Sequence, residues 1–382
     1  MVGILLSTLL LPLSLRPTFA HPVQNALTFS LKGVEDVSPA HLEGWAIFGD
    51  EKVSTGKFMV DSYGATRNLQ GEAQDRFVID HRDLSLADLI VITIEAQGDT
   101  DTLPSGIVLL AGTFSGSMAE LSFPVDLSGV SGIFILATPT DGPNTNELSG
   151  VWFLQLPPPP QPGLDLPELP GGWVYEGWAV NSGVPITTGR FTSVSSPDDF
   201  DSYSGPQAGP PFPGEDLLEN APEGLTFPPN LADGSSKVVI SVEPDIEGED
   251  PTGSAPFAIK PLVGDIPLDA ADHVNYEMGQ NLGSIPRGLA RISFPTPTVA
   301  GLVVDFRSRV EVEGSTVTLR NIPTWQTWTA ESDFAGNFRF EGQNQGLYLV
   351  KVEAPGYYAR LTLVYLPADG YIYKGAVHLF PM

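Results

Sequence analysis

The C-terminal part of the chain alternates apolar and polar residues with a period of two. The alternation runs through residues 310–312, 317–319, 338–340 and 348–352, and glycines separate the runs. Because successive side chains of a strand point to opposite faces of a sheet, this period predicts half-buried antiparallel strands. We expect about seven short strands after residue 300, and a β-sandwich is the natural way to close them.

An internal repeat organises the part of the chain that precedes this region. The stretch EGWAI at residues 43–47 recurs as EGWAV at residues 176–180. At the same offset, VSTGKF at residues 53–58 recurs as ITTGRF at residues 186–191. The order of the matching stretches is kept although the spacing drifts later, so the pattern predicts a duplicated domain.

The repeat and the composition along the chain predict an all-β protein of several segments. The segment LPPPPQP at residues 156–162 favours a stiff polyproline II spacer between the two copies. The second copy carries a long loop rich in Pro, Gly, Asp and Ser, at about residues 193–236. The predicted segments are a leader at 1–20, a first repeat at 21–156, a linker at 157–163, a second repeat at 164–300 and a final sandwich at 301–382.

Composition and charge exclude several classes of function. The 382 residues include 40 glycines and 36 prolines, which favours turns and short strands over long helices. A formal charge of −27 repels phosphate backbones, so we expect no nucleic-acid partner. The acidity belongs to the repeats, because residues 302–382 hold 8 acidic and 7 basic residues. The absence of cysteine excludes disulfides, thiolate nucleophiles and cysteine zinc sites.

The N-terminal segment predicts export. Residues 4–15 are an apolar run of about twelve, and residues 18–20 follow as a small-x-small cleavage pattern typical of a secretory signal peptide. The run is shorter than the ~20 apolar residues that a spanning helix needs. We therefore expect no integral membrane span and an extracellular, periplasmic or cell-envelope location.

The repeat resembles the extracytoplasmic domain of anti-sigma-K factors. The residues that carry the resemblance are the EGWA core at 43–46 and 176–179 and the V-[ST]-T-G-[KR]-F strand that follows each. It covers roughly residues 22–156 and 163–299. The resemblance implies two related β-sandwich-like domains and a sensory or regulatory role beside a membrane-anchored regulator.

The C-terminal segment resembles the carboxypeptidase regulatory-like, or transthyretin-like, sandwich. The matching stretches are GSTVTL at 314–319, SDFAGNFRF at 332–340, GLYLVKV at 346–352 and the closing Gly356-Tyr357. The resemblance implies an Ig-like β-sandwich that is an accessory module to another activity.

Candidate catalytic residues are few. The five histidines are scattered without metal-ligand spacing, and neither a nucleophile elbow nor a phosphate-binding loop is present. Trp45 and Trp178 sit among apolar residues, which favours core packing over sugar stacking. Glu43 and Glu176 occupy matching places and favour a structural role over that of a general acid.

The acidic loops offer the remaining candidate chemistry. They crowd oxygen donors that calcium prefers, although none fits the twelve-residue EF-hand loop, and solvated loops are the simpler interpretation. The loop at residues 141–147 is one of them. The metal site is therefore unknown, with weak calcium candidates at Asp198, Asp199, Asp201, Asp245, Glu247, Glu249 and Asp250. We predict no other cofactor.

These observations predict an exported non-enzymatic protein that binds or scaffolds through its surfaces. Its partner would be a protein or a cell-surface polymer, and duplicating a binder raises avidity. Homo-oligomers or filaments stay open, because the alternating residues Leu27, Phe29 and Leu31 form a strand that a neighbour can receive. The alternatives are the regulatory role above and a polysaccharide hydrolase with two carboxylates in a groove beside Trp45 or Trp178.

Overall fold

The computed structural model describes residues 26–79, 84–142, 144–246, 248, 250, 253–293, 298–366 and 371–382. The predicted signal peptide, residues 1–20, lies outside them. Strands and loops build the described residues, which contain no α-helix, so the all-β prediction is confirmed. The short 3-10 turns are η1 (Leu84–Leu86), η2 (Glu147–Ser149) and η3 (Leu282–Ser284). No helix in the described part of the chain is long and apolar enough to cross a membrane.

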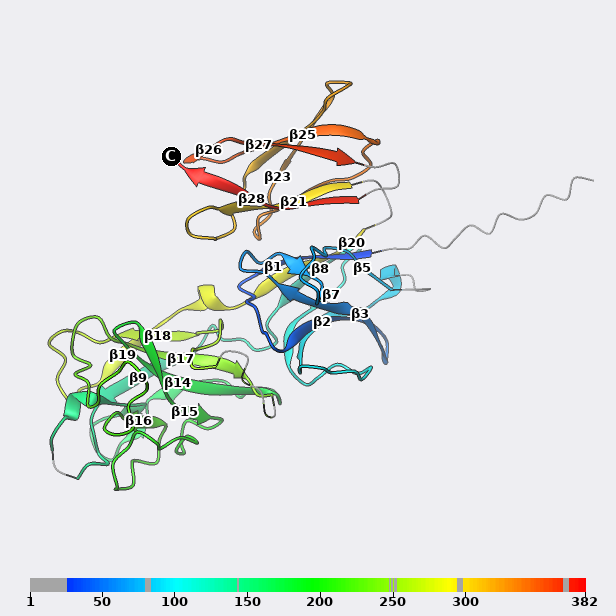
Figure 1. Cartoon of the computed structure of the whole chain (residues 1–382). Helices are drawn as coiled ribbons and strands as arrows, with labels where there is room; N and C mark the ends of the chain where they lie inside the picture. Colours follow the sequence, from blue (N-terminus) through cyan, green and yellow to red (C-terminus); the bar gives the residue numbers. More distant parts are fainter. Residues whose placement is uncertain are drawn as a thin grey trace, which may run out of the picture.

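The first unit is one sheet of nine strands that curls around its own core (Figure 1). Its order is β4-β3-β2-β6-β7-β8-β20-β1-β5. Phe29 and Phe58 come from opposite ends of this order, yet their rings stack with centroids 5.7 Å apart, and Phe77 packs on both. The strands are β1 (Ala26–Lys32), β2 (His41–Phe48), β3 (Glu51–Val60), β4 (Thr66–Arg67), β5 (Phe77–Val78), β6 (Leu89–Glu95), β7 (Val108–Thr113), β8 (Met118–Ser122) and β20 (Arg287–Ser293).

The second unit repeats this arrangement. Its sheet has the order β15-β14-β17-β18-β19-β9-β10-β16, and β13 also pairs with β9. A separate two-stranded ladder joins β11 and β12. The strands are β9 (Ser131–Leu136), β10 (Gly150–Trp152), β11 (Leu154–Gln155), β12 (Gln161–Pro162), β13 (Leu164–Asp165), β14 (Trp173–Asn181), β15 (Val184–Phe191), β16 (Gly214–Asp216), β17 (Lys237–Pro244), β18 (Leu262–Asp265) and β19 (Tyr276–Gln280).

The sequence repeat corresponds to one local structure formed twice. The register of β2 against β3 shifts at Gly44/Trp45, and that of β14 against β15 shifts at Gly177/Trp178. A Cβ atom on Gly44 would lie 3.3 Å from the Phe29 ring, and one on Gly177 would lie 2.6 Å from an equivalent phenylalanine ring, that of residue 153. Each bulge therefore uses glycine to admit an aromatic ring from the opposite side of the core.

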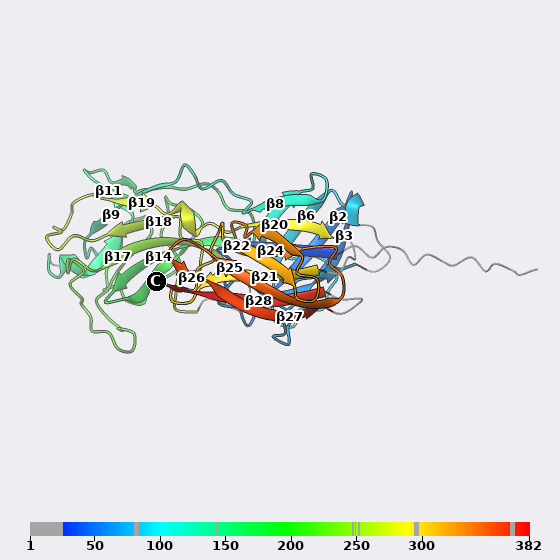
Figure 2. The same cartoon turned by 90° about the horizontal axis from the view of Figure 1, so that it is seen from above.

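The two units exchange their closing strands. β9 follows β8 in the sequence, but it pairs with β19 and β10 of the second unit. β20 follows β19, but it pairs with β8 and β1 of the first unit. Figures 1 and 2 show the same crossing, with β20 beside β8 and β9 beside β19. Each repeat is thus completed by the strand that comes after the other repeat.

The two exchanged strands occupy equivalent positions. Each carries a glycine opposite an apolar residue of the preceding sheet strand, and a core residue two places later. The opposed pairs are Gly132 with Met278 and Phe134 with Tyr276 in the second unit, and Gly288 with Leu121 and Ala290 with Ala119 in the first. The register of β9 against β19 therefore matches that of β20 against β8, and each strand fills in one sheet the place that the other fills in the second.

Strand pairing divides the chain differently from the predicted boundaries at 21–156 and 164–300. Strands β9 and β10, within residues 131–152, join the second sheet, and residues 287–293 return to the first. Alternation of apolar residues predicts that a strand forms but does not identify its partner. The strand Leu27, Phe29 and Leu31 lies within β1, which is paired on both sides by β20 and β5.

The proline-rich segment forms a hairpin and not an extended spacer. Leu154 pairs with Pro162 and Gln155 with Gln161, so the four prolines at residues 157–160 stand in the turn, where no N–H donor is needed. The amide of Asn275 holds the hairpin, since its Oδ1 accepts from the backbone N–H of residue 156 (3.0 Å) and its Nδ2 donates to the same residue's carbonyl (2.9 Å).

The third unit is the predicted sandwich. Its two sheets have the orders β24-β21-β28-β26 and β23-β22-β25-β27. The Asp333 carboxylate accepts the backbone N–H groups of Ala335 (3.0 Å) and Asn337 (2.9 Å), which explains the Asp-x-x-Gly-x-Phe turn. The predicted strand at Val310 and Val312 is wrong, because both precede β22 in a loop and Val310 is 52% exposed. The strands are β21 (Thr298–Asp305), β22 (Thr316–Asn321), β23 (Thr327–Glu331), β24 (Asn337–Phe340), β25 (Gly346–Glu353), β26 (Tyr357–Tyr358), β27 (Arg360–Leu366) and β28 (Tyr371–Pro381).

The third unit packs on the first unit, as Figures 1 and 2 show. A small apolar cluster joins Tyr63 and Ala65 of the first unit to Leu302, Val304 and Ala376 of the third. The guanidinium of a nearby arginine, residue 309, lies 4.9 Å from the centre of the Tyr63 ring. The junction therefore combines burial of apolar side chains with a cation–π contact.

Candidate functional site

The outer sheet of the third unit presents an exposed apolar face. We call Leu347, Leu349, Leu361, Leu363 and Tyr365 the outer apolar face. Leu361, Leu363 and Tyr365 are each 56% exposed, whereas Val364 and Leu366 on the other side of β27 are buried in the sandwich. Cross-strand pairing places Leu347 opposite Tyr365 and Leu349 opposite Leu363, so these side chains form one contiguous surface.

The face lies on an edge strand. Among the described residues, β27 pairs with β25 on one side and with no strand on the other. The backbone groups on its outer side therefore have no partner in the sheet. An edge of this kind is a ready template for another extended segment.

Basic side chains border the outer apolar face. Register places Arg320 opposite Leu349 and Lys351 opposite Leu361. The Arg320 guanidinium lies 5.7 Å from the ring of Trp325, which is 70% exposed. Lys351 forms an ion pair with Glu353 at 2.7 Å, so Arg320 is the side chain at this border that favours an acidic partner.

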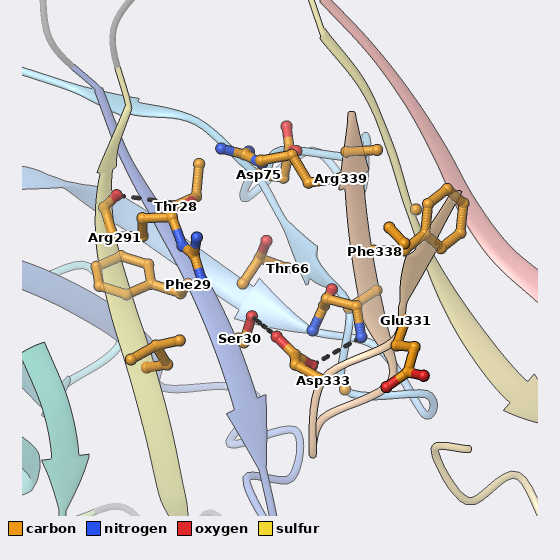
Figure 3. A pocket seen from close by; sticks show the side chains of 17 residues that line it. Thr28, Phe29, Ser30, Thr66, Asp75, Arg291, Glu331, Asp333, Phe338 and Arg339 are labelled. Atoms are coloured by element: carbon orange, nitrogen blue, oxygen red, sulfur yellow. Dashed lines mark hydrogen bonds between the residues drawn. The ribbon is translucent and has the colours of Figure 1, made fainter. Parts of the chain in front are cut away.

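A polar cavity of about 190 Å³ lies between the first and third units (Figure 3). The hydroxyl of Ser30 on β1 donates to the Asp333 carboxylate at 2.8 Å. The ammonium of Lys32 donates to the carbonyl of Phe334 at 3.3 Å, and the guanidinium of Arg287 lies 4.9 Å from the Phe334 ring. These contacts join β1 and β20 to the turn that precedes β24.

Asp75 and Arg339 lie beside each other in the lining of this cavity (Figure 3). Burial raises the pKa of Asp75 from 3.8 to about 7, and the positive charge of Arg339 only partly opposes the rise. Burial also lowers the pKa of Arg339. The junction therefore contains a carboxyl group that changes charge near neutral pH. The sequence holds no spacing signal for this pair, because the two residues come from different units.

The calcium candidates do not converge on one site among the described residues. Glu247 and Glu249 lie outside these residues, and Asp245 is exposed. Asp199 accepts the backbone N–H of Arg190 at 2.7 Å, and Asp250 forms an ion pair with the Arg190 guanidinium at 3.3 Å. Asp201 is exposed in a turn and accepts from the backbone N–H of residue 204 through its carbonyl. A calcium site at these residues stays a prediction.

Carboxylates instead fasten the long loop of the second repeat. Asp198 accepts the backbone N–H groups of Gly214 (2.7 Å) and Phe200 (3.0 Å), and burial raises its pKa to about 6. Glu215 accepts the N–H of Tyr203 at 2.7 Å, and burial raises its pKa to about 8. The neighbouring Asp216 accepts the indole N–H of Trp152 at 2.7 Å. These side chains organise the loop through hydrogen bonds to backbone and side-chain donors.

Within the part of the chain that the structure describes, two groups of potential metal ligands occur that the sequence analysis missed. In the first, His41, Glu43 and Asp99 lie close together, but the ammonium of Lys57 is 3.6 Å from Glu43 and 3.0 Å from Asp99. A cation already neutralises these carboxylates. The second group is Glu147, Asp272 and His273, of which the last two are exposed on the surface.

Trp45 and Trp178 belong to buried hydrogen-bond chains. Trp45 is 1% exposed and its indole N–H donates to Thr93 at 2.8 Å; the Thr93 hydroxyl in turn donates to Glu95. Trp178 is 2% exposed and donates to Ser241 at 2.8 Å, in the same arrangement. The core-packing prediction is confirmed, and neither indole ring is exposed for stacking on a sugar.

Glu43 and Glu176 are structural, as expected. Glu43 is 3% exposed and accepts a hydrogen bond from the hydroxyl of Ser54 on β3. Glu176 is 6% exposed and accepts from Thr187 at 2.5 Å and from Arg190 at 3.1 Å on β15. Burial raises the pKa of Glu176, and the hydrogen bond from Thr187 partly offsets the rise. Each glutamate fastens the bulged hairpin of its repeat.

Comparison with known families supports the assignment of the third unit. The model of the carboxypeptidase regulatory-like domain matches residues 298–370. The resemblance of the C-terminal segment to this domain is therefore confirmed. The resemblance of the two repeats to anti-sigma-K ectodomains stays a prediction. No curated protein matches the sequence.

Several solved structures share weak similarity with the chain. The shaft pilin SpaA from Lactobacillus rhamnosus GG is 13% identical, over 56% of this chain and 89% of the pilin, with a TM-score of 0.19. The group B streptococcus pilus 2b backbone protein is 11% identical, over 70% of this chain and 94% of its own, with a TM-score of 0.20. The Bacillus anthracis TIE protein is 9% identical, over 94% and 52% respectively, with a TM-score of 0.21. Similarity at this level carries no statement about function.

Proposed function

We propose that the chain is an exported, non-catalytic protein of the cell envelope or cell exterior that binds or scaffolds through its surfaces. The observation that carries the proposal is the outer apolar face on the edge strand β27. Large exposed apolar surfaces are typical of protein interaction sites. The buried carboxylates of Glu43 and Glu176 support the proposal, because both already form hydrogen bonds or ion pairs that hold the fold together.

The geometry of the face favours a protein partner that adds an extended strand. The outer backbone of β27 supplies hydrogen bonds, and the alternate side chains Leu361, Leu363 and Tyr365 supply apolar contacts on one side. Covering each half-exposed apolar side chain contributes about 1 kcal/mol. Arg320 at the border of the face favours a segment that carries an acidic residue.

Retention of the labelled protein on the surface of the producing cells tests this proposal. Replacing Leu361 and Leu363 together by lysine keeps both positions exposed and places two charges in the face. We expect at least a tenfold loss of retention, because a partner would have to bury these charges. Leu268→Lys is the matched control, since Leu268 is 73% exposed on the second unit.

Each outcome of this comparison is informative. Loss in the double variant together with normal retention of the Leu268 control supports binding through the outer apolar face. Equal retention of all three proteins refutes it.

A further inference from the structure

The structural basis for a further inference is the reciprocal exchange of β9 and β20. We propose that the slot between β1 and β8 also receives β20 from a second copy of this chain, so that copies assemble by strand exchange. The proposal goes beyond the outer apolar face, because it uses a different unit and a different strand.

The slot makes the same contacts with either source of β20. On one side, β20 pairs with β1 from Ala26↔Ser293 to Lys32↔Arg287. On the other side, it pairs with β8 over five residues, and Ala290 between the two is fully buried. A second copy supplies an identical strand, so the ladder hydrogen bonds and the buried side chains are conserved in the assembly.

The connection before β20 decides between the two sources. Residues 281–286 lead from β19 to β20, and they include the turn η3 and Pro286. Short linkers of this kind give an effective local concentration on the order of millimolar. Closure within one chain therefore dominates in dilute solution, and exchange between copies grows as the copies are concentrated, for example on a surface.

Transfer of β20 to a second copy also transfers the third unit. It follows β20 in the sequence, and its docking surface is on the same first unit that receives β20. The bond from Ser30 to Asp333 and the contact of Arg287 with Phe334 both join β1 or β20 to the third unit. A transferred β20 thus brings a second interface that fits the receiving copy, which favours transfer as one piece.

Single cysteines at an opposed buried pair report the source of β20. Ala119 on β8 lies opposite Ala290 on β20, and these residues are 1% and 0% exposed. The chain has no cysteine of its own, so Ala119→Cys and Ala290→Cys each create one thiol. The two full-length variants are mixed in denaturant, refolded together at about 1 µM and about 100 µM, and mildly oxidised.

We expect a disulfide-linked dimer of the two variants, with a yield that rises at least tenfold between the two concentrations. Each variant refolded alone should give none, because its thiol is buried away from its own copies. The double variant is the positive control, and its disulfide within one chain shows that the pair has suitable geometry. An intrachain bond in the double variant, with no mixed dimer at either concentration, overturns the proposal.

A shortened connection gives an independent measurement. Deleting Gly283 and Ser284 removes two residues from the path between β19 and β20, which hinders return to the same first unit. Light scattering should show a folded species of at least twice the chain mass, whereas a folded monomer would overturn the proposal. If the deletion prevents folding, the mixed-cysteine result decides. The Leu361→Lys/Leu363→Lys variant should exchange normally, which separates this proposal from the function proposed above.

Discussion

Replacing Asp75 by asparagine tests whether burial sets the charge of the cavity between the first and third units. The folded pKa of Asp75, about 7, is higher than its ordinary value of 3.8. Stability from this group is therefore fully present below pH 3.8 and is lost as pH rises through 7. Asparagine does not titrate, so the variant should gain stability relative to the natural protein over this interval.

The size of the effect follows from the difference in pKa. A pKa difference of about three corresponds to about 4 kcal/mol, because each step of one in pKa is worth ~1.36 kcal/mol. Asp75 is only partly buried, so screening by water reduces the expected value to about 2 kcal/mol. In a unit of about 100 residues, such as the first, that difference is a shift in melting temperature of roughly 8 °C or more.

The assay is thermal unfolding of both proteins between pH 4 and pH 8.5. The melting temperature of Asp75→Asn minus that of the natural protein should grow between pH 4 and pH 8 and then stay constant. Asp269→Asn, at an exposed position of the second unit, controls for the loss of one negative charge. A difference that is independent of pH, or that reverses, would mean that the attraction of Arg339 outweighs burial.

Two further predictions concern the repeats. Thr93→Val and Ser241→Ala each remove the hydroxyl that links a buried tryptophan to a buried glutamate, so each should lower the free energy of unfolding by about 2 to 4 kcal/mol in chemical denaturation. A loss below about 0.5 kcal/mol in both would contradict the role of these hydroxyls. Millimolar calcium should change the melting temperature by less than about 1 °C, because Asp198, Asp199 and Asp250 already accept hydrogen bonds or pair with Arg190. A rise of several degrees would establish a calcium site.

The sequence was informative where structure depends on local pattern. The EGW motif identified two equivalent bulged hairpins because a glycine and a tryptophan at those places satisfy one local geometry. The turn at Asp333 was recognisable because its carboxylate bonds to backbone groups two and four residues later. Such contacts are encoded within a few residues.

The strand exchange and the outer apolar face were not predicted. β9 and β20 have interchangeable patterns, and only tertiary pairing selects the sheet that each joins. The segment RLTLVYL of β27 is apolar at successive positions, a signal for two-sided contact that was available in the sequence. The pairing of Asp75 with Arg339 depends on how two units pack, which no local spacing records.

The crossing of β9 and β20 also decides how the molecule carries mechanical tension. Ala26, where the described chain begins, lies directly opposite Ser293, where β20 ends. A pull between these two points loads the β1–β20 ladder from one end and opens its hydrogen bonds in sequence. Residues 131–280 lie outside this load path, so the second unit bears no force until that ladder has separated.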